Sequence, residues 1–321
     1  MSFVHENPEE FTDLVQIIVG ETGMGRSIIE KDYWVTHTLW ALSVSGLDVW
    51  FKGGTSLSKG FGLIERFSED LDLKLEPGSV SALPSVSNWK SEGTKATAER
   101  RAFFEQLPKV LEVPGCTIEI DQETIDKSWR GANLRVLYPG LFLGELPSAI
   151  SGNVRLEVGS ARVTPHVARD LTSWVHEKLV ATNVLAEFDD NRANGVRCVH
   201  PLVPLLEKLD ALHRRFPNEK AVPAAFVRHY EDAARLIEGR AKLPPLEGYA
   251  SVRALADEML AQKQIVVIPS AADPALAPAD DARWSGIRAA HRTLHEMYWG
   301  PRIEVEDATG TIRAWTAAEL G

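Results

Sequence analysis

Two aspartates separated by one residue follow a glycine pair and two hydroxyl residues. The segment KGGTS at 52–56 is followed after thirteen residues by Asp70-Leu71-Asp72. Side chains alternate along a strand, so the two carboxylates share a face and can hold a hard cation such as Mg²⁺. Glycines let backbone N–H groups approach a phosphate closely, and hydroxyl groups add hydrogen bonds at a helix start. The pattern predicts a site for a metal-bound phosphate substrate.

The order of glycine pair, hydroxyl, helix and Asp-x-Asp strand resembles motif I of nucleotidyltransferases with a DNA polymerase β-like fold. Five blocks carry a closer resemblance, at 30–35 (EKDYWV), 51–75 (FKGGTSLSKGFGLIERFSEDLDLKL), 200–202 (HPL), 207–211 (EKLDA) and 228–232 (RHYED). Together they resemble the AbiEii/AbiGii toxin family, which includes the MenT toxins. The resemblance covers about residues 26–240.

The resemblance implies an α/β fold, with a polymerase β-like mixed sheet and N-terminal helices over 1–165 and a mainly helical domain over 166–321. It implies a toxin of a type IV-like toxin–antitoxin system that moves a nucleoside monophosphate from an NTP to an RNA acceptor. The expected acceptor is the tRNA 3′ end, with a block of translation as the result. Mg²⁺ or Mn²⁺ would be the cofactor, the NTP the substrate, and an antitoxin protein the partner. Transfer to a protein or small-molecule hydroxyl, or a non-catalytic nucleotide-binding subunit, is the alternative.

The resemblance also implies roles for individual residues. A lysine and an aspartate of the last two blocks face the nucleotide, which assigns Lys208 and Asp232 to the site; an ion pair between them is the competing interpretation. In the block at 30–35, Lys31 is expected near the active cleft, which would lie between the two domains. The residues expected to hold the triphosphate are Lys52, Gly53, Gly54, Thr55 and Ser56.

Phosphoryl transfer on this fold needs a third carboxylate beside Asp70 and Asp72, on an adjacent strand. Glu157 is the candidate, because it lies between apolar neighbours where a carboxylate is costly without a cation. It would complete the metal ligands and assist the acceptor hydroxyl. Glu119 and Asp121 share the i, i+2 spacing and remain rivals.

Composition limits the possible functions of the chain. Its 321 residues include 45 acidic and 35 basic residues, for a net charge of −10, which argues against coating nucleic acid through bulk charge. The segment 207–242 has eight bases and six acids, so it forms no strong basic stripe.

Two cysteines, Cys116 and Cys198, predict neither a disulfide framework nor a cysteine zinc site. With no long apolar stretch and no basic leader, we expect a cytoplasmic protein without membrane segments.

Periodicity predicts the elements that must position these residues. Helical spacing of apolar residues predicts helices at 8–20, 26–45 and about 95–111. Alternating segments predict a sheet of about five strands, with a helical second half from Ser173 onward. The segment 302–315 is expected to form a terminal hairpin. The predicted strands lie within 47–54, 65–78, 116–121, 132–140 and 153–163.

Overall fold

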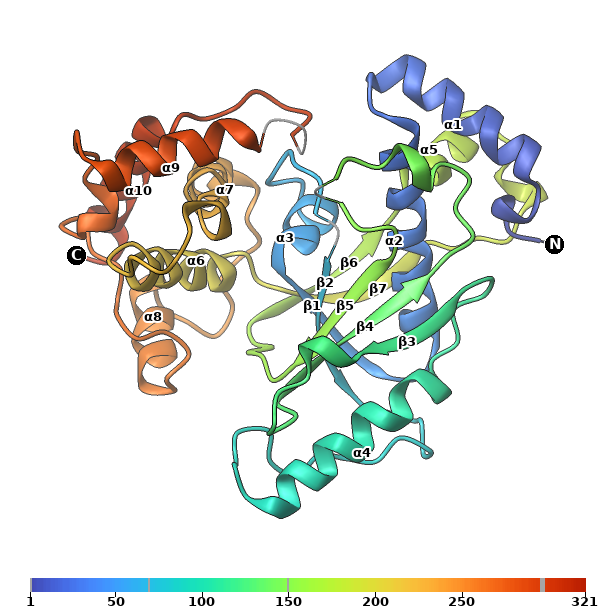
Figure 1. Ribbon diagram of the computed structural model, residues 1–321, viewed down its shortest axis with the longest axis horizontal. Helices are drawn as coiled ribbons and strands as arrows, with labels where there is room; N and C mark the ends of the chain where they lie inside the picture. Colours follow the sequence, from blue (N-terminus) through green and yellow to red (C-terminus); the bar gives the residue numbers. More distant parts are fainter. Residues whose placement is uncertain (1, 69, 149, 295–297) are drawn as a thin grey trace. The chain divides into compact units, whose positions relative to one another are not determined.

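The computed structural model describes residues 2–68, 70–148, 150–294 and 298–321 (Figure 1). Its strands are β1 (Asp48–Lys52), β2 (Asp70–Glu76), β3 (Thr117–Asp121), β4 (Gly131–Leu137), β5 (Val154–Gly159), β6 (His166–Leu171) and β7 (Ala193–Val199). Its helices are α1 (Pro8–Thr22), α2 (Arg26–Val44), α3 (Gly53–Thr55), α4 (Thr94–Val110), α5 (Trp174–Ala181), α6 (Leu202–Arg215), α7 (Arg228–Glu238), α8 (Val252–Ala261), α9 (Ala282–Thr293) and α10 (Val305–Glu319). The short α3 continues as a π-helical turn over Ser56–Gly60.

Within the described residues the strands form one mixed sheet in the order β3-β4-β5-β2-β1-β7-β6. β2 lies near the centre, antiparallel to β1 and parallel to β5, and β1 is parallel to β7.

The predicted α/β class is confirmed. The expected five strands were two too few, because β6 and β7 were missed. β6 carries exposed polar residues at the sheet edge and β7 contains Gly195, so neither presents a strong apolar alternation.

The chain forms two compact units. The first comprises residues 1–60, 69–163 and 168–198, and the second comprises 61–68, 164–167 and 199–321. Residues 168–198, which include α5 and most of β7, therefore group with the sheet, although they follow the domain boundary predicted at residue 165. The short segment 61–68, which joins the glycine pair to the Asp-x-Asp strand, groups with the helices.

In the first unit, the core lies against one face of the central strands. Leu71 and Leu73 of β2 and Leu156 and Val158 of β5 are buried, so the residues between them face the opposite side. The helix α2 contacts α1, α5 and β5, and Figure 1 shows it beside the sheet. Its residues are buried on nearly every side, which explains why its sequence has little amphipathic contrast.

In the second unit, α7 packs against α6 and α10. The terminal hairpin predicted over 302–315 is wrong, because this segment lies mostly in α10. The buried residues Val305, Ala308, Ile312 and Trp315 recur at helical spacing, and Gly310 lies inside the helix. Among the helices of the described ranges, none is both long enough and apolar enough to cross a bilayer.

Two histidines lie side by side in the first unit: His5 in the half-buried N-terminal turn and His37, fully buried, on α2. The rings of His5 and His37 are 5.0 Å apart, and Nδ1 of His5 lies 2.7 Å from the Tyr33 hydroxyl. Nε2 of His37 donates to the Pro114 carbonyl at 3.0 Å, while Nδ1 lies 3.1 Å from the Asn191 amide nitrogen and accepts from it. Burial lowers the pKa of both histidines to about 4, so both rings are neutral at pH 7.

These histidines predict loss of stability in mild acid. The unfolded chain takes up protons near pH 6.5 and the folded chain only near pH 4, so stability is full above pH 6.5 and falls as the pH drops toward 4. We expect a loss on the order of 2–4 kcal/mol, discounted for partial exposure of His5. Urea unfolding at pH 7.5 and pH 5.0 measures it. His37→Gln should reduce the pH dependence, whereas replacing the exposed His166 should not; equal pH dependence in all three proteins would contradict the assignment.

Candidate active site

The aspartates of the Asp-x-Asp motif lie on β2, directly beside β5. In the parallel register Asp70 pairs with Arg155, and Asp72 pairs with Glu157. The four side chains alternate with buried leucines and a valine, so they occupy the face of the sheet opposite the core. The structure thus brings together the three carboxylates that the sequence singled out.

The rival carboxylates lie elsewhere in the sheet. Glu119 and Asp121 are on β3, and β4 and β5 separate that edge strand from β2. Glu119 lies 3.7 Å from the guanidinium of Arg135 on the neighbouring strand. Among the three candidates, only Glu157 has a register partner in the Asp-x-Asp motif.

The carboxylates repel one another. Burial, together with the negative charges of Asp72 and Asp70, raises the pKa of Glu157 to about 7. One nitrogen of Arg155 lies 3.5 Å from Asp70 and 4.0 Å from Glu157, and its positive charge offsets part of the repulsion. A face that holds three carboxylates and one arginine favours binding of a further cation.

Gly53 provides the close approach between the glycine turn and Asp72. Its φ is +77°, in the left-handed region that side chains disfavour. A Cβ built at this position would lie 1.8 Å from Oδ2 of Asp72. Lys52, the residue before it, is the register partner of Asp72 on β1. Only glycine therefore lets the turn pass beside the Asp72 carboxylate without displacing it.

The hydroxyl residues of the turn are buried. Thr55 is 1% exposed, and its hydroxyl donates to the Asp70 carbonyl at 2.7 Å, which ties the turn to β2. Ser56 is buried to the same degree. Thr55 therefore positions the motif, and the assignment of both hydroxyls to phosphate binding stays a prediction.

A missed residue, Lys59, anchors the same turn. Its Nζ lies 2.5 Å from Oδ1 of Asp32 on α2 and donates to the Thr172 carbonyl at 2.9 Å. The other oxygen of Asp32 accepts from the backbone N–H of Trp174, at the start of α5. Lys31 is fully buried and donates to the Ser151 carbonyl. The block at 30–35 thus supplies buried anchors to the sheet unit.

In the second unit, Lys208 and Asp232 form the ion pair considered from the sequence, at 2.8 Å. Arg66, also missed, completes a buried cluster by binding both oxygens of Asp232, at 2.7 and 2.8 Å. Burial opposes charging of all three groups, yet the two cations hold the pKa of Asp232 well below its ordinary value. Burial also lowers the pKa of Lys208. Arg66 lies within the recognised block at 51–75, but its partner 166 residues away gave no local signal.

Comparison with known families bears on this geometry. The family described as "Nucleotidyl transferase AbiEii toxin, Type IV TA system" matches residues 38–305 of the 321. The chain belongs to this AbiEii family. No curated protein gives a significant match. AbiEii membership makes the chain a nucleotidyl transferase toxin of a toxin–antitoxin system and implies an antitoxin partner.

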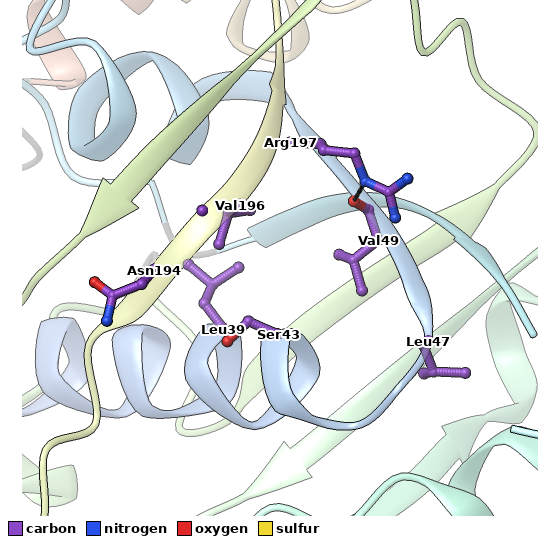
Figure 2. Close-up of a pocket in the computed structure, with 8 residues that line it drawn as sticks. Leu39, Ser43, Leu47, Val49, Asn194, Val196 and Arg197 are labelled. Carbon is purple, nitrogen blue, oxygen red and sulfur yellow. Dashed lines mark hydrogen bonds between the residues drawn. The ribbon is translucent and has the colours of Figure 1, made fainter. Parts of the chain in front are cut away.

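The AbiEii chain also has a small pocket away from these residues. Leu39 and Ser43 of α2, Val49 of β1, and Val196 and Arg197 of β7 line it (Figure 2). The Arg197 guanidinium donates to the Val49 carbonyl at 3.2 Å. None of the predicted metal or nucleotide residues lines this pocket. The candidate site is therefore the open carboxylate face rather than this cavity.

If Mg²⁺ binds at the carboxylate face, Asp70 and Asp72 would be its protein ligands and the substrate would supply the others. In the ranges that the structure covers, no three Asp, Glu, His or Cys side chains form a group that could hold a metal ion unaided. Mg²⁺ commonly uses one or two protein carboxylates and takes its remaining oxygens from water and substrate phosphates. A cation bound beside Glu157 would offset the negative charges of Asp70 and Asp72, which together with burial raise the pKa of Glu157.

The contact at Gly53 yields a direct test. Gly53→Ala should push the Asp72 carboxylate aside and reduce nucleotidyl transfer by about 10²-fold or more, as expected for a misplaced reacting group. Gly23→Ala is the matched control, because Gly23 has a φ of +73° and open space around its Cβ position. Both variants should lose about 1–2 kcal/mol of stability from the left-handed backbone. Equal activity of the two variants in a labelled-NTP assay would refute the proposed contact.

Proposed function

We propose that this chain transfers a nucleoside monophosphate from an NTP to an RNA acceptor, with the tRNA 3′ end as the target, in a Mg²⁺-dependent reaction. The observation that carries the proposal is the pairing of Asp72 with Glu157 on adjacent strands. Asp70 lies on the same face, Gly53 passes close to the Asp72 carboxylate, and the chain belongs to a nucleotidyl transferase toxin family. Modification of the tRNA end would block translation, which accounts for a toxic effect.

The reaction assigns a role to each part of the site. The acceptor oxygen forms a bond to the α-phosphorus, the bond to the pyrophosphate oxygen breaks, and the acceptor proton is released. Asp70 and Asp72 would hold Mg²⁺, or Mn²⁺ in its place, and Glu157 would assist the acceptor hydroxyl. The bound metal ion would supply neutralisation of phosphate charge. The turn at 52–56 would orient the triphosphate, and Lys208 would contribute positive charge.

Contacts to an RNA acceptor would fall to exposed basic residues of the helical unit. Lys220, Arg228, Arg240 and Lys242 are exposed on a chain whose overall charge is −10. Arg214, by contrast, donates to Asp210 at 2.8 Å. An acidic protein binds a polyanion only where basic residues gather locally, so contacts to few phosphates are expected.

Incubation with each α-labelled NTP, Mg²⁺ and either total RNA or protein extract tests the proposal. The wild-type protein should label RNA of tRNA size. Asp70→Asn, Asp72→Asn and Glu157→Gln should each reduce labelling by at least about 10²-fold, the order of effect of losing one electrostatic group. Glu119→Gln, on the distant edge strand, is the control and should retain activity.

Other outcomes separate the alternatives. Labelled protein without labelled RNA would replace the RNA acceptor with a protein hydroxyl. A labelled small molecule would point to that class of acceptor. Binding of NTP without any labelled product would indicate a nucleotide-binding subunit and overturn the transferase assignment.

A further inference from the structure

A second cavity lies in the first unit, between α5, the end of β6 and the loop before β7. Its volume is about 320 Å³. Every residue that lines it falls within 168–198, a range that groups wholly with the sheet unit. None of the carboxylates at the candidate active site lines it. The cavity is therefore a feature of one unit and shares no side chain with the face of β2 and β5.

Two carboxylates at this cavity lack a matching cation. The Glu177 carboxylate, on α5, makes no hydrogen bond or ion pair with any residue that the structure describes. Burial and the negative charge of Asp32 raise the pKa of Glu177, and Lys59 offsets only part of this effect. Asp170 accepts a hydrogen bond from the backbone N–H of Gly195 at 2.8 Å, and across the described ranges it forms no ion pair.

The basic side chains around the cavity are already engaged. Arg192, which lines it, binds Asp190 through Nε and Nη2 at distances of 2.6 to 3.1 Å. Lys178, the residue after Glu177 on α5, pairs with Glu21 of α1. The cavity therefore presents a surplus of negative charge to a ligand.

The rest of the wall combines apolar groups with a buried imidazole. Leu171 is fully buried and Val180 is 48% exposed, so a methylene chain can pack between the interior and the surface. His176 is 2% exposed, and burial lowers its pKa, which favours the neutral ring. Its Nε2 lies 3.1 Å from an oxygen of Asp190 and makes no hydrogen bond with a described residue. A ligand that donates hydrogen bonds can satisfy this nitrogen.

We propose that this cavity binds a ligand with primary alkylammonium groups, of the class of aliphatic diamines. Glu177 and Asp170 would hold the ammonium groups through charge-assisted hydrogen bonds. The methylene chain would pack on Leu171 and Val180. The same chemistry is present in a free diamine and in a lysine side chain of a partner protein. This inference does not depend on the proposed nucleotidyl transfer.

The chemistry of the wall disfavours other classes of ligand. An anion would meet the two carboxylates, while the guanidinium of Arg192 is already bound to Asp190. A metal ion prefers several oxygen ligands gathered at one point. The described part of the chain contains no group of three Asp, Glu, His or Cys side chains close enough to hold one. Separate carboxylates beside an apolar wall match an organic cation better.

Isothermal titration calorimetry of the full chain tests the inference with three probes: pentanediamine, pentanediol and Nα-acetyl-lysinamide. An ionic strength of about 0.15 M limits attraction to the overall negative charge, because charges farther apart than about 8 Å are largely screened. The wild-type chain should bind one pentanediamine in a saturable manner. Pentanediol has the same chain length without charge and should not bind.

Glu177→Gln should weaken diamine binding by about tenfold or more, the order expected for loss of a charge-assisted hydrogen bond. Asp170→Asn should also weaken it and retains an acceptor for Gly195. Val180→Phe should weaken it by filling the cavity. Glu112→Gln is the matched control and should bind normally, because it removes the same charge at an exposed position after α4. Thermal unfolding checks that each variant is folded.

Three results would overturn the inference: no saturable binding of the diamine, equal binding of pentanediol, or equal affinities of Glu177→Gln and Glu112→Gln. If Glu177→Gln does not fold, unchanged diamine binding in Asp170→Asn and Val180→Phe would also overturn it. Nα-acetyl-lysinamide distinguishes the two sources of the ligand. Binding as tight as that of the diamine would assign the site to a lysine side chain of a partner protein, and weaker binding would assign it to a free diamine; both support an alkylammonium site.

Discussion

The parallel pairing of β2 with β5 places three carboxylates on one face of the sheet, where they repel one another. Leu71 and Leu73 are buried on the opposite face, so the strands cannot rotate the acids away from one another. Arg155 offsets part of the charge. Burial of Glu157, together with the repulsion that Arg155 does not offset, raises the pKa of this carboxyl. A divalent cation that binds together with a triphosphate would reduce the repulsion among the three carboxylates. The same charges that destabilise the empty site would therefore favour binding of the metal-bound substrate.

Each of the two units also contains a buried ion pair that involves a residue of the block at 51–75. Asp32 on α2 holds Lys59 at the end of the glycine turn, and Asp232 on α7 holds Arg66 in the following segment. Each ion pair joins a residue of the block at 51–75 to a helix that is distant in the sequence. Buried ion pairs contribute little net stability, since desolvation consumes most of their attraction. Their value here lies in fixing where the turn and the segment run.

The sequence predicted the parts of the site that depend on local pattern. Strand alternation placed Asp70 and Asp72 on one face, and the glycine pair marked a turn that no other residue fits at Gly53. Glu157 could not be separated from Glu119 and Asp121, because strand order is a long-range property.

The remaining differences have physical causes of the same kind. The strands β6 and β7 lack a strong apolar alternation, and α10 contains a glycine that imitates a turn. Arg66 could not be assigned because its partner lies on α7, far along the chain. Thr55 was expected to face phosphate, yet its hydroxyl binds the backbone of the neighbouring strand. Local pattern therefore identified the chemistry, whereas tertiary pairing decides which groups are free to perform it.

The most direct test of the central claim is a crystal structure with Mn²⁺ and a non-hydrolysable NTP analogue, in which anomalous scattering locates the metal. The account predicts a peak bound by Asp70 and Asp72 at about 2.0–2.2 Å, with triphosphate oxygens completing its coordination and Gly53 beside the phosphates. The account would be contradicted if the nucleotide and the metal were bound elsewhere, with Arg155 as the cation nearest to Asp70 and Glu157.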